Sequence, residues 1–113
     1  MKSKDVVVAL AALAQESRLS IYRLLVQAGP AGMAAGAIAE KLGLPPATLS
    51  FHLKELSHAG LAVSRQEGRY VIYSANFGAM VKLVGFLTEN CCGGDVCAPE
   101  CQPQVNLKEG VQQ

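Results

Sequence analysis

The four cysteines are the residues of this chain whose type and spacing best suit ligand binding. Cys91, Cys92, Cys97 and Cys101 all lie within eleven of the 113 residues. A disulfide framework would distribute cysteines along the chain and join distant segments, whereas a cluster in one terminal region is typical of metal or metalloid binding. Because thiolates are soft ligands, the cluster predicts a site for a soft, thiophilic ion.

Three of these thiolates can surround one ion if the chain turns sharply between them. The Gly93-Gly94 pair makes such a turn inexpensive, so Cys97 can fold back towards Cys91 and Cys92. Trivalent arsenic or antimony accepts three sulfurs in a pyramid, and As(III) or Sb(III) is therefore the favoured ligand. Zinc or cadmium prefers four ligands in a tetrahedron, so a site that includes Cys101 is the alternative.

A thiol oxidoreductase is a less favoured interpretation of the same cysteines. Such chemistry needs a thiolate of low pKa beside a cation or a helix N-terminus. Here the cysteines follow the C-terminal end of a predicted helix, where the helix dipole disfavours a thiolate. Asp95 and Glu100 add negative charge. We therefore expect neither an enzyme nor an enzymatic cofactor.

Length and composition indicate one small domain that is partly covered by a partner. A chain of 113 residues is the size of a single domain, and half of its residues are apolar. Charged residues make up only 17%, below the roughly 25% of an average domain. The longest apolar stretch near the start, residues 6–14, is too short to span a bilayer and has no cleavage-like ending. A cytoplasmic protein is expected, with no membrane partner.

The hydrophobic pattern predicts a mainly α-helical fold with one β-hairpin. Apolar residues at helical spacing are followed by two short alternating runs and then by helical spacing again. The predicted helices cover residues 5–15, 17–28, 34–42, 46–59 and 77–89, and the predicted strands cover 61–66 and 70–74. Glu67-Gly68 supplies the tight turn between the strands. This order is that of a winged helix-turn-helix, with a domain at 1–90 and a cysteine-containing tail at 91–113.

A helix-turn-helix followed by a hairpin is typical of double-stranded DNA binding. The first residues of its second helix enter the major groove, and there Thr48, Ser50 and His52 can hydrogen-bond to base edges or phosphates. Phe51 could belong either to the core or to the DNA contact. The other predicted DNA-binding residues are cations that suit phosphate contact: Lys54 on the same helix, and Arg65 and Arg69 at the hairpin tip.

The same segment carries a resemblance to a known family. The run Thr48-Leu49-Ser50-Phe51-His52-Leu53-Lys54-Glu55-Leu56, then Ala59-Gly60-Leu61, then Arg65 to Arg69 and Tyr73 resemble the ArsR/SmtB family of metalloregulatory repressors, over residues 5–92. The resemblance implies a homodimer on operator DNA that is released by a metal ion or metalloid. The cysteine pair after the last helix resembles the arsenite-sensing branch with a C-terminal site. The acid-and-histidine zinc site of the family is missing, because residues 77–89 contain neither His nor Asp.

Two further features agree with a DNA-binding dimer. The first and last helices carry apolar stripes beyond what a small core needs, and a two-fold dimer through them would bury these stripes. Residues 1–74 hold eight basic and five acidic side chains, a net charge of +3, whereas residues 75–113 have a net charge of −2. The basic bias of the first part is compatible with DNA. The sequence thus predicts an arsenite-responsive transcriptional repressor.

Overall fold

The chain folds into five α-helices with a small antiparallel sheet, in a computed structural model that describes residues 1–94. The elements are α1 (Ser3–Leu13), α2 (Glu16–Ala28), β1 (Met33–Ala34), α3 (Ala35–Leu42), α4 (Pro46–His58), β2 (Ala62–Glu67), β3 (Tyr70–Ala75), α5 (Phe77–Leu87) and the 3-10 turn η1 (Cys91–Gly94). The predicted fold class, a winged helix-turn-helix, is confirmed. Within residues 1–94, no helix combines the length and apolar character that a membrane span needs.

The sheet contains one strand that the sequence did not predict. β1 pairs antiparallel with β3 through Met33–Tyr73 and Ala34–Ile72, which makes the strand order β1-β3-β2. Two residues are too few to show an alternating pattern, so β1 carries no periodic signal. Gly32 lets the chain approach β3 here, because a Cβ at this position would collide with the Tyr73 carbonyl.

The hairpin turn lies one residue later than the sequence predicted. Glu67 pairs with Tyr70, so Gly68 and Arg69 form the two-residue loop. Gly68 has a φ of +60°, and it is the first of the two loop residues, where glycine suits a tight hairpin turn. The shift matters for function because it places Arg69 at the tip of the wing.

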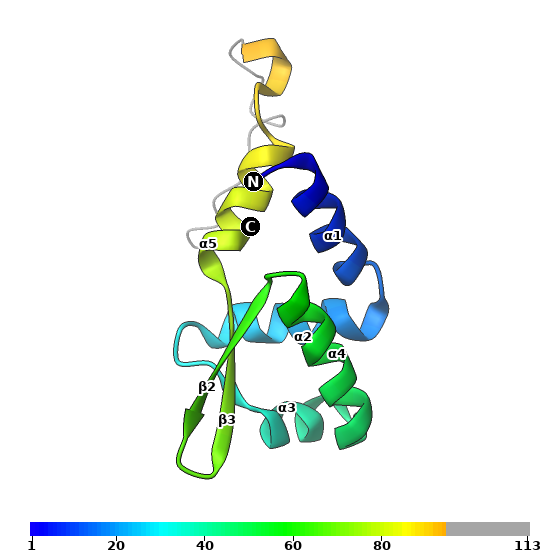
Figure 1. Cartoon of the computed structure of the whole chain (residues 1–113), viewed down its shortest axis with the longest axis vertical. Helices are drawn as coiled ribbons and strands as arrows, with labels where there is room; N and C mark the ends of the chain where they lie inside the picture. The colour runs from blue at the N-terminus through cyan, green and yellow to red at the C-terminus, as the bar shows by residue number, and fades with distance from the viewer. Residues whose placement is uncertain (95–113) are drawn as a thin grey trace, which may run out of the picture.

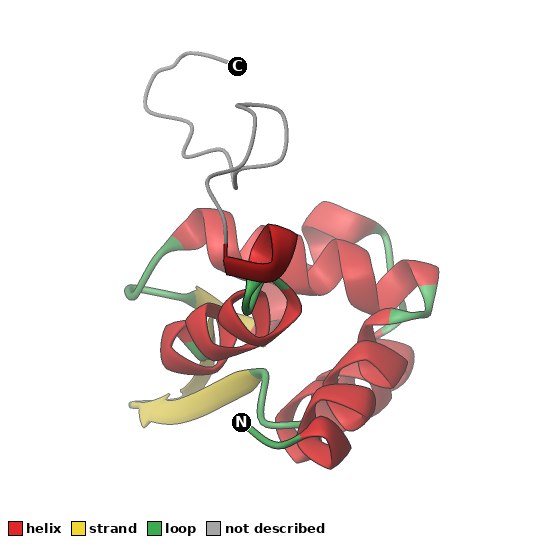
Figure 2. Ribbon diagram, turned by 90° about the horizontal axis from the view of Figure 1, so that it is seen from above, coloured by secondary structure: helices red, strands yellow, loops and turns green. Residues whose placement is uncertain are grey.

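The core is formed where α2 and α3 pack against α4 and against β3, with further buried residues from α1 and α5. Its largest fully buried side chains are Ile21, Leu25, Ile38, Leu49, Leu53, Leu56 and Leu61. In Figure 1, α1 and α5 occupy one end of the long axis, whereas the start of α4 and the hairpin tip lie at the other end. Viewed along this axis in Figure 2, the strands lie to one side of the helices. The start of α4 and the wing tip therefore lie at the end of the molecule opposite to α1 and α5.

Tyr22 on α2 provides a stability prediction. Its side chain is buried, and its hydroxyl has no hydrogen-bond partner among residues 1–94. Because an unpaired buried hydroxyl costs free energy, Tyr22→Phe is expected to raise the free energy of unfolding by about 1 kcal/mol at pH 7, measured by urea denaturation. Destabilisation by a similar amount would show that the hydroxyl has a stabilising partner.

The same variant tests the alkaline behaviour of the fold. Burial raises the pKa of Tyr22 above its ordinary value of 10.0. The folded state therefore retains a proton that the unfolded chain loses, and stability falls as the pH rises above about 10. Tyr22→Phe is expected to make this loss smaller than in the wild type.

Candidate nucleic-acid interface

Helix α4 presents one face to solvent and buries the other. Three of the residues predicted to bind DNA, Thr48, Ser50 and Lys54, are exposed. Pro46 occupies the first turn of the helix, where proline is well tolerated because its missing N–H would be unpaired anyway. All three side chains are therefore accessible, but at about 100° per residue Ser50 and Lys54 share one side of the helix and Thr48 lies about 160° from Ser50.

His52 belongs to the buried stripe of α4. Its side chain is only 8% exposed, and its Nδ1 lies 3.3 Å from Arg18 Nη1. The prediction that His52 contacts DNA does not agree with this placement. Leu49, His52, Leu53 and Leu56 have the i, i+3, i+4, i+7 spacing of one buried helix stripe, so the sequence did contain the signal.

Phe51, which the sequence could not assign, belongs to the exposed face. It is 56% exposed, and its ring packs edge-on against the His52 ring with a centroid distance of 5.7 Å. A large exposed aromatic residue on such a helix can contact the methyl group of thymine. Its position outside the buried stripe of α4 is the sequence signal that could have identified it.

The two wing arginines have different environments. The Arg65 guanidinium donates to Glu67 Oε2 at 2.6 Å and to the Ala31 carbonyl at 2.7 Å, with a longer bond of 3.5 Å to the Pro30 carbonyl. It therefore ties the wing to the loop between α2 and β1. Arg69 is exposed in the turn itself. Of the two predicted phosphate contacts, Arg69 is the better placed, because Arg65 is already engaged within the protein.

The cysteine segment begins after α5 has ended. α5 stops at Leu87, two residues before the predicted end, and both Asn90 and Cys92 have positive φ values. Adjacent side chains on a regular helix diverge by about 100°, but here the Sγ atoms of Cys91 and Cys92 are 3.8 Å apart. Cys92 is disulfide-bonded in this structure, so the two sulfurs can approach one ion together only after reduction.

The other predicted ligands, Cys97 and Cys101, lie outside the described residues. Within residues 1–94, no group of three or more His, Cys, Asp or Glu side chains is placed to hold a metal ion. The described part of the chain therefore contains two of the predicted ligand residues, Cys91 and Cys92, and the rest of the predicted site is a matter of proposal.

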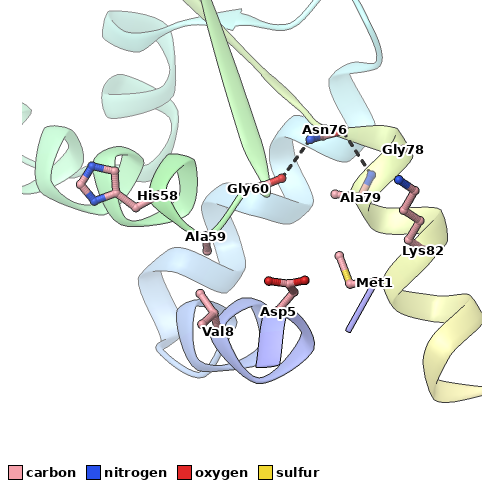
Figure 3. A pocket seen from close by; sticks show the side chains of 10 residues that line it. All are labelled: Met1, Asp5, Val8, His58, Ala59, Gly60, Asn76, Gly78, Ala79 and Lys82. Atoms are coloured by element: carbon pink, nitrogen blue, oxygen red, sulfur yellow. Dashed lines mark hydrogen bonds between the residues drawn. The ribbon is translucent and has the colours of Figure 1, made fainter. Parts of the chain in front are cut away.

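A cavity of about 610 Å³ lies where three elements of the fold meet. It is lined by α1, the turn after α4 and the start of α5 (Figure 3). At its edge Asn76 accepts a hydrogen bond from the Ala79 N–H at 3.1 Å, which caps α5, and donates to the Gly60 carbonyl at 3.0 Å. Asn76 thus connects the start of α5 directly to the turn that follows α4.

Comparisons with known proteins agree with this arrangement. A family of helix-turn-helix domains matches residues 13–65. Nodulation protein NolR of Rhizobium meliloti is 36% identical over 96 residues, which cover 85% of this chain and 75% of the relative. An ArsR-like transcriptional regulator from Rhodococcus sp. RHA1 superposes with a TM-score of 0.70 and 26% identity, covering 80% of this chain and 83% of the other. The homodimeric winged helix-turn-helix DNA-binding domain Mb0332 of Mycobacterium bovis superposes with a TM-score of 0.61 and 28% identity. The superposition covers 84% of this chain and 88% of the other.

Proposed function

Because this chain belongs to the ArsR-like family of winged helix-turn-helix transcriptional regulators, we propose that it is a repressor released from DNA by As(III) or Sb(III). The protein is a transcriptional regulator that binds double-stranded DNA as a homodimer, and it is not an enzyme. The observation that carries the ligand proposal is that the sulfurs of Cys91 and Cys92 lie 3.8 Å apart directly after α5. The preference for a three-sulfur pyramid over a tetrahedron rests on the spacing of the cysteines in the sequence. Cys97 is the proposed third ligand, within a tail of residues 91–113 that follows a DNA-binding domain of residues 1–90.

The exposed face of α4 is the proposed DNA-reading surface. Thr48, Ser50 and Phe51 would face base edges, and Lys54 would contact phosphate. The start of α4 and the wing tip lie at the same end of the molecule, so both can approach one duplex (Figure 1). In a two-fold dimer the two α4 helices then enter successive major grooves.

Exposed apolar side chains at the opposite end support dimerisation through α1 and α5. These are Val7, Val8 and Leu10 on α1 and Val81, Val84 and Leu87 on α5. The two helices contact each other within one chain and lie at the same end of the molecule (Figure 1). We call these six residues the outer apolar face. A second copy of the same chain fits it, because an isologous contact covers both faces at once.

Helix α5 offers a physical route from ligand to DNA. Its far end leads into Cys91 and Cys92, its middle carries half of the outer apolar face, and its start is tied to the turn after α4 through Asn76. A ligand that pulls the end of α5 can therefore change the spacing of the two α4 helices. Release requires tighter ligand binding by the weak-binding form, since equal affinity for both forms shifts nothing.

The test begins with a DNA duplex selected by the wild-type chain from a random library. Fluorescence anisotropy of this complex is then followed as arsenite, antimonite or zinc is added to the phosphine-reduced protein. Arsenite and antimonite are expected to weaken DNA binding by about 5- to 150-fold, the range of typical coupling energies, and zinc is expected to have little effect. Release by zinc or cadmium would instead favour a tetrahedral site that includes Cys101. A complex that ignores all of these ions would contradict the ligand proposal and leave the DNA-binding function in place.

Substitutions on α4 are expected to change sequence preference. Thr48→Ala and Ser50→Ala should each cost about 1–3 kcal/mol of discrimination at one base position and leave binding to random DNA unchanged. The measurement is repeated site selection with each variant. Ser3→Ala, an exposed serine at the start of α1, is the matched control. Unchanged preferences in both α4 variants would contradict the proposed docking of this helix.

Substitutions on the wing are expected to separate the roles of its two arginines. Arg69→Ala should weaken binding to all sequences and reduce the slope of log affinity against log salt by about one, because one phosphate contact is lost. Arg65→Ala should leave that slope nearly unchanged and increase the mobility of the wing, seen as faster amide exchange in β2. An equal loss of slope in both variants would show that Arg65 leaves its intramolecular partners to contact phosphate.

A further inference from the structure

One part-buried side chain joins α1 to α4, the proposed DNA-reading helix. Arg18, in the first turn of α2, donates from Nε to the Ala12 carbonyl at 2.7 Å, near the end of α1. The same guanidinium places Nη1 3.3 Å from His52 Nδ1 on α4. Its backbone N–H is held by the Gln15 side chain at 2.9 Å, which fixes the position of this turn. A single side chain thus bridges α1 and α4.

The chemistry of this bridge depends on both residue types. A guanidinium has donors fixed in one plane, so it can reach two acceptors in different directions, which a lysine ammonium on a flexible stem does less well. Because arginine has no acceptor, His52 must accept at Nδ1, and its proton must be on Nε2. Burial of an imidazole among leucines is costly unless it is hydrogen-bonded, and Arg18 supplies that bond.

The bridge acts on the exposed face of α4 as well as on the buried one. The His52 ring packs edge-on against Phe51, which is exposed on the proposed DNA-reading surface. The orientation of this surface relative to α1 is therefore set partly by the Arg18–His52 contact. α1 carries Val7, Val8 and Leu10 of the outer apolar face, so the contact connects the dimer surface to the reading surface.

We infer that Arg18 and His52 are positioning residues that set the spacing of the two reading helices in the dimer. The inference rests on the proposed function, since it assumes that α4 reads DNA and α1 contributes to the dimer. A dimer with rigidly placed α4 helices binds two half-sites only at one separation. Without the bridge each α4 can tilt relative to α1. The protein then loses its selectivity for half-site spacing while keeping its general attraction for DNA.

The experiment compares two substitutions that differ in one acceptor atom. His52→Asn places Oδ1 close to the position of the native Nδ1, whereas His52→Leu retains apolar bulk without an acceptor. Each variant is titrated by anisotropy against three duplexes: the duplex selected by the wild type, the same duplex with one base pair inserted between its half-sites, and a random sequence of equal length. Thermal unfolding of each variant verifies that the proteins compared are folded.

His52→Leu is expected to bind the selected duplex about tenfold more weakly than the wild type, a loss of about 1.4 kcal/mol. It should bind the random duplex with unchanged affinity and discriminate less against the inserted base pair. His52→Asn should recover most of the affinity and the spacing selectivity, and Arg18→Gln should behave like His52→Leu. Long-range ¹⁵N–¹H spectra of the wild type should show His52 protonated on Nε2.

Three results would overturn the inference while the proposed function stands. The first is unchanged spacing selectivity in His52→Leu. The second is an equal loss of affinity for the selected duplex in His52→Leu and His52→Asn. The third is a His52 tautomer protonated on Nδ1. Failure of the wild type to select any duplex is a different outcome, because it overturns the proposed function itself and the inference with it.

Discussion

In Cys91→Ser and Cys92→Ser variants, arsenite is expected to leave the protein–DNA complex intact. A serine hydroxyl is a hard oxygen donor and does not replace a thiolate at a thiophilic centre, so each substitution removes one of three proposed ligands. DNA affinity without arsenite should be unchanged, because both residues follow the end of α5 and neither belongs to the core. Arsenite weakens DNA binding by the wild type about 5- to 150-fold in this proposal, and it should leave DNA binding by either variant unchanged, as measured by anisotropy titration.

The remaining two cysteines decide the geometry of the site. Cys97→Ser is expected to abolish the response, and Cys101→Ser is the matched control that should retain it. If Cys101→Ser also abolishes the response, and zinc releases DNA as well as arsenite does, a tetrahedral site replaces the three-sulfur site. Retention of the arsenite response in Cys91→Ser and Cys92→Ser would remove the cysteine pair from the site altogether.

Val84→Glu is expected to convert the dimer into monomers at micromolar concentration. Val84 lies on the outer apolar face and is 49% exposed in the isolated chain. In a two-fold dimer each substitution occurs twice, and burial of an unpaired carboxylate costs several kcal/mol. An increase of the dimer dissociation constant by at least about a hundredfold corresponds to about 2.8 kcal/mol. Sedimentation equilibrium measures this change, and affinity for the selected duplex should fall with it.

Val63→Glu provides the matched control for dimerisation. Val63 on β2 is 48% exposed, so the residue type and exposure are nearly the same, but it lies on the wing and outside the outer apolar face. The dimer dissociation constant of Val63→Glu should match that of the wild type. A Val84→Glu protein that remains dimeric would place the dimer contact somewhere other than α1 and α5.

The sequence by itself determined most of the architecture and the chemical character of the tail. Helix and strand periods are local properties, so the helices, the hairpin and the fold class were predictable to within about two residues at most ends. The exposed positions of Thr48, Ser50 and Lys54 also follow from the helical period around the leucine stripe of α4. Clustered cysteines are equally visible without a structure, because their spacing along the chain is short.

Only the tertiary structure decided which polar side chains are engaged within the protein. His52 meets Arg18 from 34 residues away, and Arg65 meets the Ala31 carbonyl from a similar distance, so no local pattern contains either contact. Strand β1 exists only because β3 passes beside it. Hydrogen-bond partners of this kind are set by the packing of whole elements. That packing removed His52 from the predicted DNA contacts, committed Arg65 to bracing the wing and left Arg69 and Phe51 exposed.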